Sequence, residues 1–265
     1  MITLLPNQIH LWVTEPASIQ EASRLAEYDE LLSPDEKNRQ QRFHFEKDRK
    51  VYLCTRALVR TVLSEYAPVA PHQWEFERNA FDKPEILHSQ EGIPPLRFNL
   101  THSDKLIACA VTLENNIGVD VENRERNPDL LDIANRYFSP KEARELNQVP
   151  VGERGWKFFE YWTLKEAYIK ACGKGLHIPL DAFSMDLSKP GNVSISFSGE
   201  REDDPQRWQF QLYQLCGGHY LSLAVETSLP LSPECVLIRE GFSKREISSG
   251  DCILTRSSAT RVNEL

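Results

Sequence analysis

The sequence predicts an α+β protein made of two similar halves, each a small antiparallel sheet packed with helices, related by pseudo-two-fold symmetry. Two similar helix openings, "LLSPDEKNR" and "YFSPKEARE", place Ser33 and Ser139 106 residues apart. A strand-like segment precedes each opening, with Ile9 and Ile117 108 residues apart, and a long helical pattern follows each. Ordered similarity at one offset favours a duplicated unit over chance repetition of a common helix start.

Each opening has the residues expected at a helix N-terminus. Ser33 and Ser139 are candidate N-caps, and a proline follows each at the first helical position. Glu36 and Glu142 stand where a capping box needs an acidic side chain. The long helices are predicted over "RKVYLCTRALVRTVLSEY" and "GWKFFEYWTLKEAYIKAC".

Short apolar segments with turn-rich links predict the strands. "LRFNL", "KLIACAVTL" and "IGVDVE" follow one another closely, which indicates an antiparallel meander. "NVSISFS", "RWQFQLYQL" and "HYLSLAVE" supply the second half. We place the boundary near residue 115, giving halves 1–115 and 116–228, and expect 229–265 to be a polar, mobile C-terminal extension.

Composition limits the function classes. The net charge of −8 and pI of about 5.5 argue against nucleic-acid binding. No uncharged apolar run is long enough to span a membrane, and no secretory leader is visible, so we expect a cytoplasmic protein without a membrane partner. The six cysteines are too dispersed for a zinc ribbon or redox dithiol. The fused halves predict a monomer.

One segment departs from this acidic balance. Residues 37–60 carry eight Lys or Arg residues against two acids. Such a local basic face on an acidic protein is suited to binding an anion.

Two carboxylates interrupt the apolar strand "IGVDVE". Because side chains alternate along a strand, Asp120 and Glu122 share one face. Two neighbouring carboxylates on an enclosed face need a cation, and Mg²⁺ prefers carboxylate oxygens. The alternative is an ordinary half-exposed strand with an acidic outer face.

The segment "YWTLKEAYIKACGKGL" reads as a largely buried helix that ends near Gly173. Glu166 and Lys170 are neighbours at i and i+4, and we expect Lys165 beside them. Their functional interpretation is a third carboxylate for the metal and a lysine for phosphate. A surface ion pair is the alternative.

Two further loops offer anion contacts. Thr101 and His102 crowd the turn in "RFNLTHSDK", where they could bind an anion or satisfy the turn backbone. Lys83 precedes a proline in "FDKPE" and is a phosphate contact or an ordinary surface lysine.

In order and spacing, "FNLTHS", "IGVDVE" and "WTLKEAYIKACGKGL" resemble the 4′-phosphopantetheinyl transferase superfamily, in its Sfp-type branch with two fused halves. The resemblance spans roughly residues 5 to 228. It implies transfer of 4′-phosphopantetheine from coenzyme A to a serine of an acyl or peptidyl carrier protein, with release of adenosine 3′,5′-bisphosphate.

The resemblance also implies roles for particular residues. Three carboxylates would surround Mg²⁺ on the coenzyme A pyrophosphate: Asp120, Glu122 and Glu166. Lys170 would face the same phosphates. From the chemistry of the transfer, Glu166 is our candidate base, directly or through a metal-bound water. The coenzyme A pocket would include Thr101, His102 and Lys83, to which we add Lys47 and Arg56 from the basic stretch.

Two other function classes use the same features. A metal-dependent phosphohydrolase or nuclease would activate water with these carboxylates in place of serine. A non-catalytic module that binds coenzyme A or a carrier protein would keep the pocket without turnover.

Overall fold

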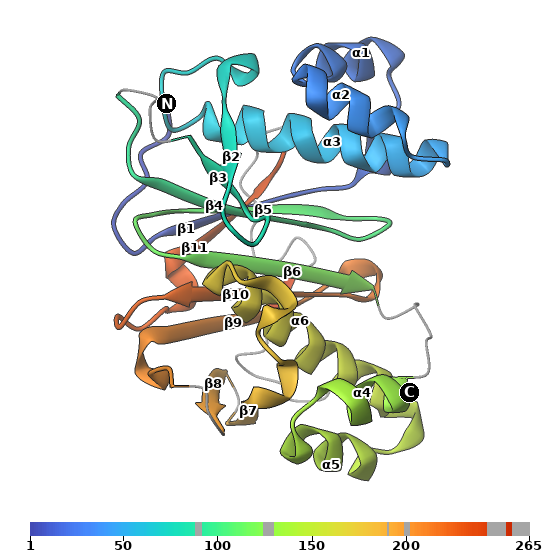
Figure 1. The fold of residues 1–265 in the computed structure, drawn as a ribbon, viewed down its shortest axis with the longest axis vertical. Coiled ribbons are helices and arrows are strands. Elements are labelled where there is room, and N and C mark those ends of the chain that lie inside the picture. The colour runs from blue at the N-terminus through green and yellow to red at the C-terminus, as the bar shows by residue number, and fades with distance from the viewer. Residues whose placement is uncertain (88–91, 124–129, 190, 199–201, 243–252, 256–265) are drawn as a thin grey trace.

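The computed structural model describes residues 1–87, 92–123, 130–189, 191–198, 202–242 and 253–255. Two four-stranded sheets face each other, and helices cover their outer faces (Figure 1). The first sheet has the order β11-β1-β5-β4, with bounds Val236–Glu240, Ile9–Thr14, Ile107–Leu113 and Leu96–His102. The second has the order β12-β9-β10-β6, with bounds Ile253–Thr255, Trp208–Leu215, His219–Glu226 and Ile117–Asn123.

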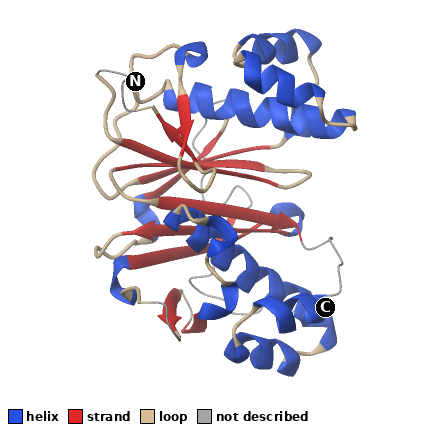
Figure 2. Cartoon of the chain, in the orientation of Figure 1, coloured by secondary structure: helices blue, strands red, loops and turns tan. Residues whose placement is uncertain are grey.

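Among the described helices, α3 packs on the first sheet and α6 on the second, the shorter helices pack on these two, and short hairpins complete the halves (Figure 2). In the first half, α1, α2 and α3 have the bounds Ala22–Glu30, Pro34–Gln41 and Glu46–Leu63. In the second, α4, α5 and α6 have the bounds Leu130–Tyr137, Pro140–Gln148 and Arg154–Cys172. The hairpins are β2 with β3 and β7 with β8, with bounds Phe76–Arg78, Pro84–Ile86, Phe183–Lys189 and Asn192–Phe197.

Short 3-10 turns connect these elements. They are Pro16–Ser18, Pro71–Gln73, Val151–Glu153, Gly175–His177, Leu180–Ala182, Pro205–Arg207, Cys216–Gly218 and Pro233–Cys235.

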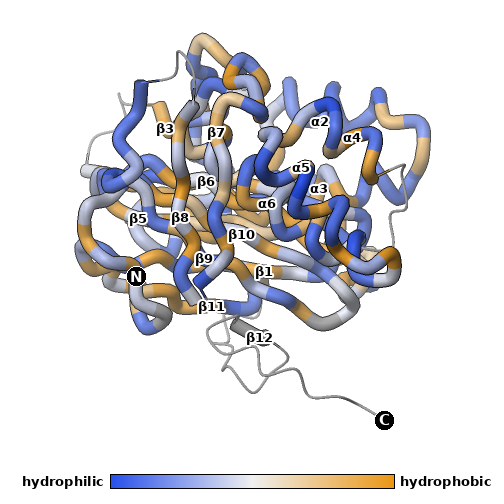
Figure 3. Tube along the Cα trace, turned by 90° about the horizontal axis from the view of Figure 1, so that it is seen from below, coloured by the Kyte–Doolittle hydropathy of each residue, from blue (hydrophilic) through white to orange (hydrophobic). Residues whose placement is uncertain are grey.

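Three layers of apolar side chains hold the structure together, one between the sheets and one under each set of helices. Hydrophobic residues concentrate on the strands, whereas the outer helices α2 and α5 are mostly hydrophilic (Figure 3). In β6, Ile117, Val119 and Val121 join the layer between the sheets. The predicted alternation is confirmed, and it turns Asp120 and Glu122 toward α6.

Both predicted capping boxes are present. Ser33 Oγ accepts from the Glu36 backbone N–H at 3.3 Å, and Glu36 accepts from the Ser33 N–H at 3.0 Å. The corresponding bonds between Ser139 and Glu142 are 3.3 Å and 2.9 Å. Each cap satisfies helix donors that have no intrahelical partner.

The α+β class and the small sheets are confirmed. The order β1-β5-β4 recurs as β6-β10-β9, with antiparallel pairing throughout. The pseudo-two-fold relation and the boundaries 1–115, 116–228 and 229–265 stay predictions.

The expected meander is wrong at its third strand. Residues 114–116 turn the chain away from the first sheet, and β6 pairs with β10 of the second. The reason is burial: the apolar face of β6 packs between the sheets while its other face is covered by α6. Link length alone does not distinguish this crossing from a hairpin.

Part of the C-terminal extension differs from the expected mobile tail. β11 pairs in parallel with β1, an exception to the antiparallel sheets that we expected. Gly241 N–H donates to Val13 O at 2.7 Å, and Phe242 stacks on Tyr28 with ring centroids 4.5 Å apart. Farther along, β12 pairs with β9.

No described helix is long and apolar enough to cross a membrane.

Candidate functional site

The site begins with an unusually close contact between α6 and β6. A Cβ atom added at Gly118 would lie 2.0 Å from the Ala167 carbonyl oxygen and 2.5 Å from the Ala171 nitrogen. The helix backbone therefore lies directly on the strand backbone, which only glycine permits. This contact brings Glu166 and Lys170 alongside the acidic face of β6.

Lys170 and Asp120 form the centre of the site. Lys170 Nζ lies 2.6 Å from Asp120 Oδ1 and 3.3 Å from both Thr101 Oγ1 and the Val119 carbonyl oxygen. Thr101 also donates to Asp120 Oδ1 at 3.2 Å. Asp120 Oδ2 is buried and has no hydrogen-bond partner. One oxygen of this carboxylate thus remains available to a ligand.

Glu166 lies in the same negative field. Burial and the charge of Asp120 raise the pKa of Glu166 to about 7, Glu122 adds to the rise, and Lys170 opposes it. Lys170 therefore compensates only part of the negative charge. Such a set of carboxylates favours binding of a further cation.

Side chains form hydrogen bonds with the backbone groups along the edge of β6 that faces away from β10. They belong to Lys83, Asn99, Thr101 and Lys170. Asn99 Oδ1 accepts from the Val119 N–H at 2.9 Å, and Thr101 Oγ1 accepts from the Val121 N–H at 3.3 Å. Through these bonds β4 of the first half is held against β6 of the second.

A basic groove lies between α2, α3 and the β2–β3 hairpin. It measures about 600 Å³, and the cations lining it are Arg39, Arg42, Arg56, Arg60 and Arg78. Arg60 is neutralised by Glu36 at 2.7 Å. Arg56 Nε, in contrast, is buried without a hydrogen-bond partner, and burial lowers the pKa of this guanidinium. The groove therefore has an uncompensated donor suited to an anion.

His102 is the last residue of β4, directly after Thr101. Partial burial, and then the positive charges of Lys170 and Arg56, lower the pKa of His102. The side chain of His102 is exposed. Lys47 is exposed on the first turn of α3 and does not line the groove.

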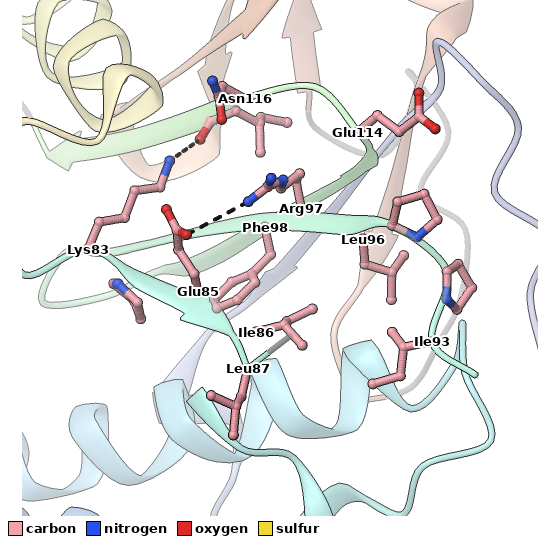
Figure 4. A pocket seen from close by; sticks show the side chains of 14 residues that line it. Lys83, Glu85, Ile86, Leu87, Ile93, Leu96, Arg97, Phe98, Glu114 and Asn116 are labelled. Carbon is pink, nitrogen blue, oxygen red and sulfur yellow. Dashed lines mark hydrogen bonds and ion pairs between the residues drawn. The ribbon is translucent and has the colours of Figure 1, made fainter. Parts of the chain in front are cut away.

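Lys83 reaches across from the first half to the second. Its Nζ donates to the carbonyl oxygens of Ile117 at 3.2 Å and Ala171 at 3.3 Å. Figure 4 shows the side chain extending from β3 toward β6, at one end of a pocket of about 280 Å³. Burial lowers its pKa to about 8.

The expected place of Lys165 beside Glu166 and Lys170 is wrong. Its ammonium is fully buried on another side of α6, 2.8 Å from Glu142 Oε2. The carbonyl oxygens of Leu180 and Phe183 each accept from it at 2.7 Å. Consecutive helical residues diverge by about 100° around the axis, and this divergence separates Lys165 from Glu166.

In the part of the chain that the structure describes, no group of three or more His, Cys, Asp or Glu side chains is arranged to hold a metal ion. Lys170 contacts Asp120 Oδ1, a position that a metal would need. The predicted roles of the site residues stay predictions.

Our sequence reasoning missed three contributors to this site: Asn99, Gly118 and the cation Arg78 of the groove. Gly118 had a signal, because Ala167 and Ala171 form a small-residue stripe on the facing helix. Asn99 had a weaker one, since it precedes Thr101 by two residues and so shares its face of β4. Arg78 had none.

Comparison with known proteins agrees with these features. The profile of the 4′-phosphopantetheinyl transferase superfamily matches residues 116–224, and that of the N-terminal region of 4′-phosphopantetheinyl transferases matches residues 20–114. The chain is similar to 4′-phosphopantetheinyl transferase HetI of Nostoc sp., with 38% identity over 66% of this chain and 73% of the relative.

Two further similarities differ in strength. With 4′-phosphopantetheinyl transferase Sfp of Bacillus subtilis, identity is 31% over 84% of this chain and 93% of the relative. The crystal structure of Thermotoga maritima holo-[acyl-carrier-protein] synthase aligns at a TM-score of 0.35 and 22% identity, over 43% of this chain and 64% of that chain, which is too weak to carry an argument. From the profiles and the two curated relatives, the chain belongs to the 4′-phosphopantetheinyl transferase superfamily, in its Sfp-type branch.

Proposed function

We propose that the protein binds coenzyme A where β4, β6 and α6 meet and transfers its 4′-phosphopantetheine arm to a serine of an acyl or peptidyl carrier protein. The observation that carries the proposal is the cluster of Lys170, Asp120 and Glu166, beside a basic groove that contains the unpaired Arg56 Nε. Coenzyme A carries a diphosphate and a separate phosphate on its nucleoside, so it requires two regions that can bind phosphate.

The oxygen donors of this cluster suit Mg²⁺ by their chemistry, although the described side chains are not arranged around a metal ion. Asp120 has a buried oxygen without a partner, and the raised pKa of Glu166 indicates surplus negative charge. Asp120, Glu122 and Glu166 would hold the ion, since hard divalent cations prefer oxygen ligands. When bound, Mg²⁺ would supply Lewis-acid stabilisation of the charge on the diphosphate.

The basic groove would take the nucleotide end of coenzyme A. Arg56 and His102 would contact the ribose 3′-phosphate, because Arg56 offers an uncompensated donor and the positive charges of both Lys170 and Arg56 act on His102. Thr101 would line the passage to the diphosphate. Lys83 and Lys47 stay predicted phosphate contacts, although the ammonium of Lys83 now donates to two carbonyl oxygens.

The transfer requires a base and a cation. The carrier serine oxygen attacks the β-phosphorus of coenzyme A, and the bond from that phosphorus to the bridging oxygen breaks. Glu166 takes the serine proton as the general base. Lys170 neutralises the charge that develops on the departing adenosine 3′,5′-bisphosphate. We expect the enzyme to act as a cytoplasmic monomer.

Intact-mass measurement of an apo carrier protein tests the function. The carrier is incubated with the enzyme, coenzyme A and Mg²⁺, with a parallel EDTA control. We expect a mass increase of one phosphopantetheine that EDTA abolishes. Cleavage of coenzyme A without carrier modification would indicate a phosphohydrolase, and coenzyme A binding without either product would indicate a binding module.

A further inference from the structure

We propose that the turn of residues 79–83 is a clasp that sets the distance between the nucleotide groove and the carboxylates, with Asn79 as a positioning residue. The inference rests on the proposed function, because it concerns how coenzyme A spans the two halves. Asn79 acts through hydrogen bonds to protein groups and does not itself touch the substrate.

The clasp is locally rigid. Asn79 Oδ1 accepts from the backbone N–H groups of Phe81 at 2.9 Å and Lys83 at 3.0 Å. The Asn79 N–H donates to the Lys83 carbonyl oxygen at 3.0 Å, and the Asp82 N–H donates to the Asn79 carbonyl oxygen at 3.0 Å. An asparagine that bonds its own turn in this way fixes the backbone of the loop.

From this rigid turn, two side chains reach the C-terminal end of α6. Asn79 Nδ2 donates to the Gly173 carbonyl oxygen at 2.9 Å, and Lys83 Nζ donates to that of Ala171 at 3.3 Å. The last carbonyl groups of a helix have no intrahelical partner, so the first half supplies the missing donors. A Cβ atom at Gly173 would lie 3.0 Å from Asn79 Nδ2, which shows how closely the turn fits.

The clasp also reaches β6, because Lys83 Nζ donates to the Ile117 carbonyl oxygen at 3.2 Å. Ile117 stands three residues before Asp120, and Ala171 directly follows Lys170. The clasp therefore contacts both β6 and α6, the elements that carry the carboxylates and Lys170. It projects from the β2–β3 hairpin, which also lines the groove of Arg56.

Coenzyme A must contact both regions at once, so its affinity depends on their separation. The affinity of a ligand confined to the groove does not depend on this separation. Misplacement of reacting groups by about 1 Å can reduce rates by roughly a hundredfold. A clasp defect should therefore weaken coenzyme A and leave a groove ligand unaffected.

The test replaces Asn79 in two ways. Asn79→Asp keeps the acceptor that holds the turn and removes the donor to Gly173, whereas Asn79→Leu is neutral and of similar size. Calorimetry then measures the dissociation constants of coenzyme A with Mg²⁺ and of adenosine 3′-monophosphate, which reaches only the groove. We expect the first constant to rise by roughly tenfold in both variants, within the usual range of coupling between sites, and the second to stay within about twofold.

Asn147→Asp is the matched control, because Asn147 Nδ2 donates to the Ala143 carbonyl oxygen at 2.8 Å within one half. It should alter neither constant. Unchanged coenzyme A affinity in both Asn79 variants would overturn the clasp, and so would equal weakening of both ligands.

Hydrogen–deuterium exchange tests the clasp without any ligand. In Asn79→Asp and Asn79→Leu, the peptide spanning the end of α6 should exchange faster than in the wild-type protein. If the wild-type protein fails to bind coenzyme A, the proposed function fails, and this exchange still decides the clasp. Unchanged exchange in both variants would refute it.

Discussion

Lys165 and Lys170 lie five residues apart on α6, and both pair with a carboxylate, yet their surroundings differ. Lys165 is fully buried, and Glu142 and two carbonyl oxygens satisfy its three donors. The side chain of Lys170 is 28% exposed, and its partner Asp120 keeps one buried oxygen without a hydrogen bond.

The comparison distinguishes a structural ion pair from a ligand site. A fully satisfied buried pair has nothing left to bind, and losing one member leaves an uncompensated charge. A partly exposed pair with a spare oxygen can exchange partners at lower cost. We therefore expect the Lys165 pair to govern folding and the Lys170 pair to govern catalysis.

The largest expected effect is on stability. Lys165→Met should lower the free energy of unfolding by about 3–5 kcal/mol, because Glu142 would remain buried without its cation. Lys170→Met should lower it by less, because Lys170 is partly exposed and Asp120 keeps its hydrogen bond from Thr101. Urea denaturation followed by circular dichroism measures both, and equal losses in the two variants would remove the distinction.

The transfer rate, in contrast to stability, should depend on Lys170 more than on Lys165. Lys170→Ala should lower the transfer rate by roughly 10²–10³-fold while the protein stays folded, because a developing phosphate charge loses its cation. Single-turnover measurement of carrier modification gives the rate. Lys141→Ala, which removes an exposed partner of Asp186, is the matched control and should retain full activity. Wild-type turnover in Lys170→Ala would exclude Lys170 from the mechanism.

Removing the spare carboxylate oxygen should affect the metal. Asp120→Asn should lower transfer by roughly a hundredfold and abolish its dependence on Mg²⁺ concentration, because a neutral amide is a poor ligand for a hard cation. Titration of the activity with Mg²⁺ measures this dependence. A metal titration identical to that of the wild-type protein would reduce Asp120 to a structural residue.

The smallest expected effect is a pH dependence in the protein without ligands. Burial and Asp120 raise the pKa of Glu166 to about 7 from 4.5, so the folded state binds its proton more tightly than the unfolded state. Stability contributed by this proton is present below pH 4.5 and is lost as the pH rises through 7. Glu166→Gln should therefore be more stable than the wild-type protein at pH 8, by roughly 1–3 kcal/mol, and equally stable near pH 4.

Thermal unfolding at both pH values measures this difference. A constant difference across the pH range would mean that Glu166 titrates normally. Addition of Mg²⁺ should reduce the difference at pH 8, because a bound cation favours the charged carboxylate.

Local sequence patterns predicted much of the fold. The capping boxes at Ser33 and Ser139 and the helix end at Gly173 depend on contacts within a few residues, which the sequence displays directly. The alternation in β6 could also be predicted from the sequence. The pairing of β6 with β10 could not, because the choice of partner strand depends on residues about a hundred positions away.

The functional site, too, was predicted only in part from the sequence. The sequence predicted that Asp120, Glu166 and Lys170 belong together, through strand alternation, helical spacing and a family resemblance. It did not show which face of α6 meets β6, because that face is set by the contact of Gly118 with Ala167 and Ala171. Nor did it show the clasp at Asn79, whose bonds cross between the halves.

The sequence by itself therefore determined the long helices, the capping boxes, the alternation of β6 and the chemical types available for catalysis, since these depend on short-range geometry. Tertiary structure alone decided which edge of β6 was left for Asn99, Thr101 and Lys83, and which carboxylate oxygen stayed without a partner. The physical reason is that polar satisfaction and burial are properties of the whole packed chain, and no local segment contains them.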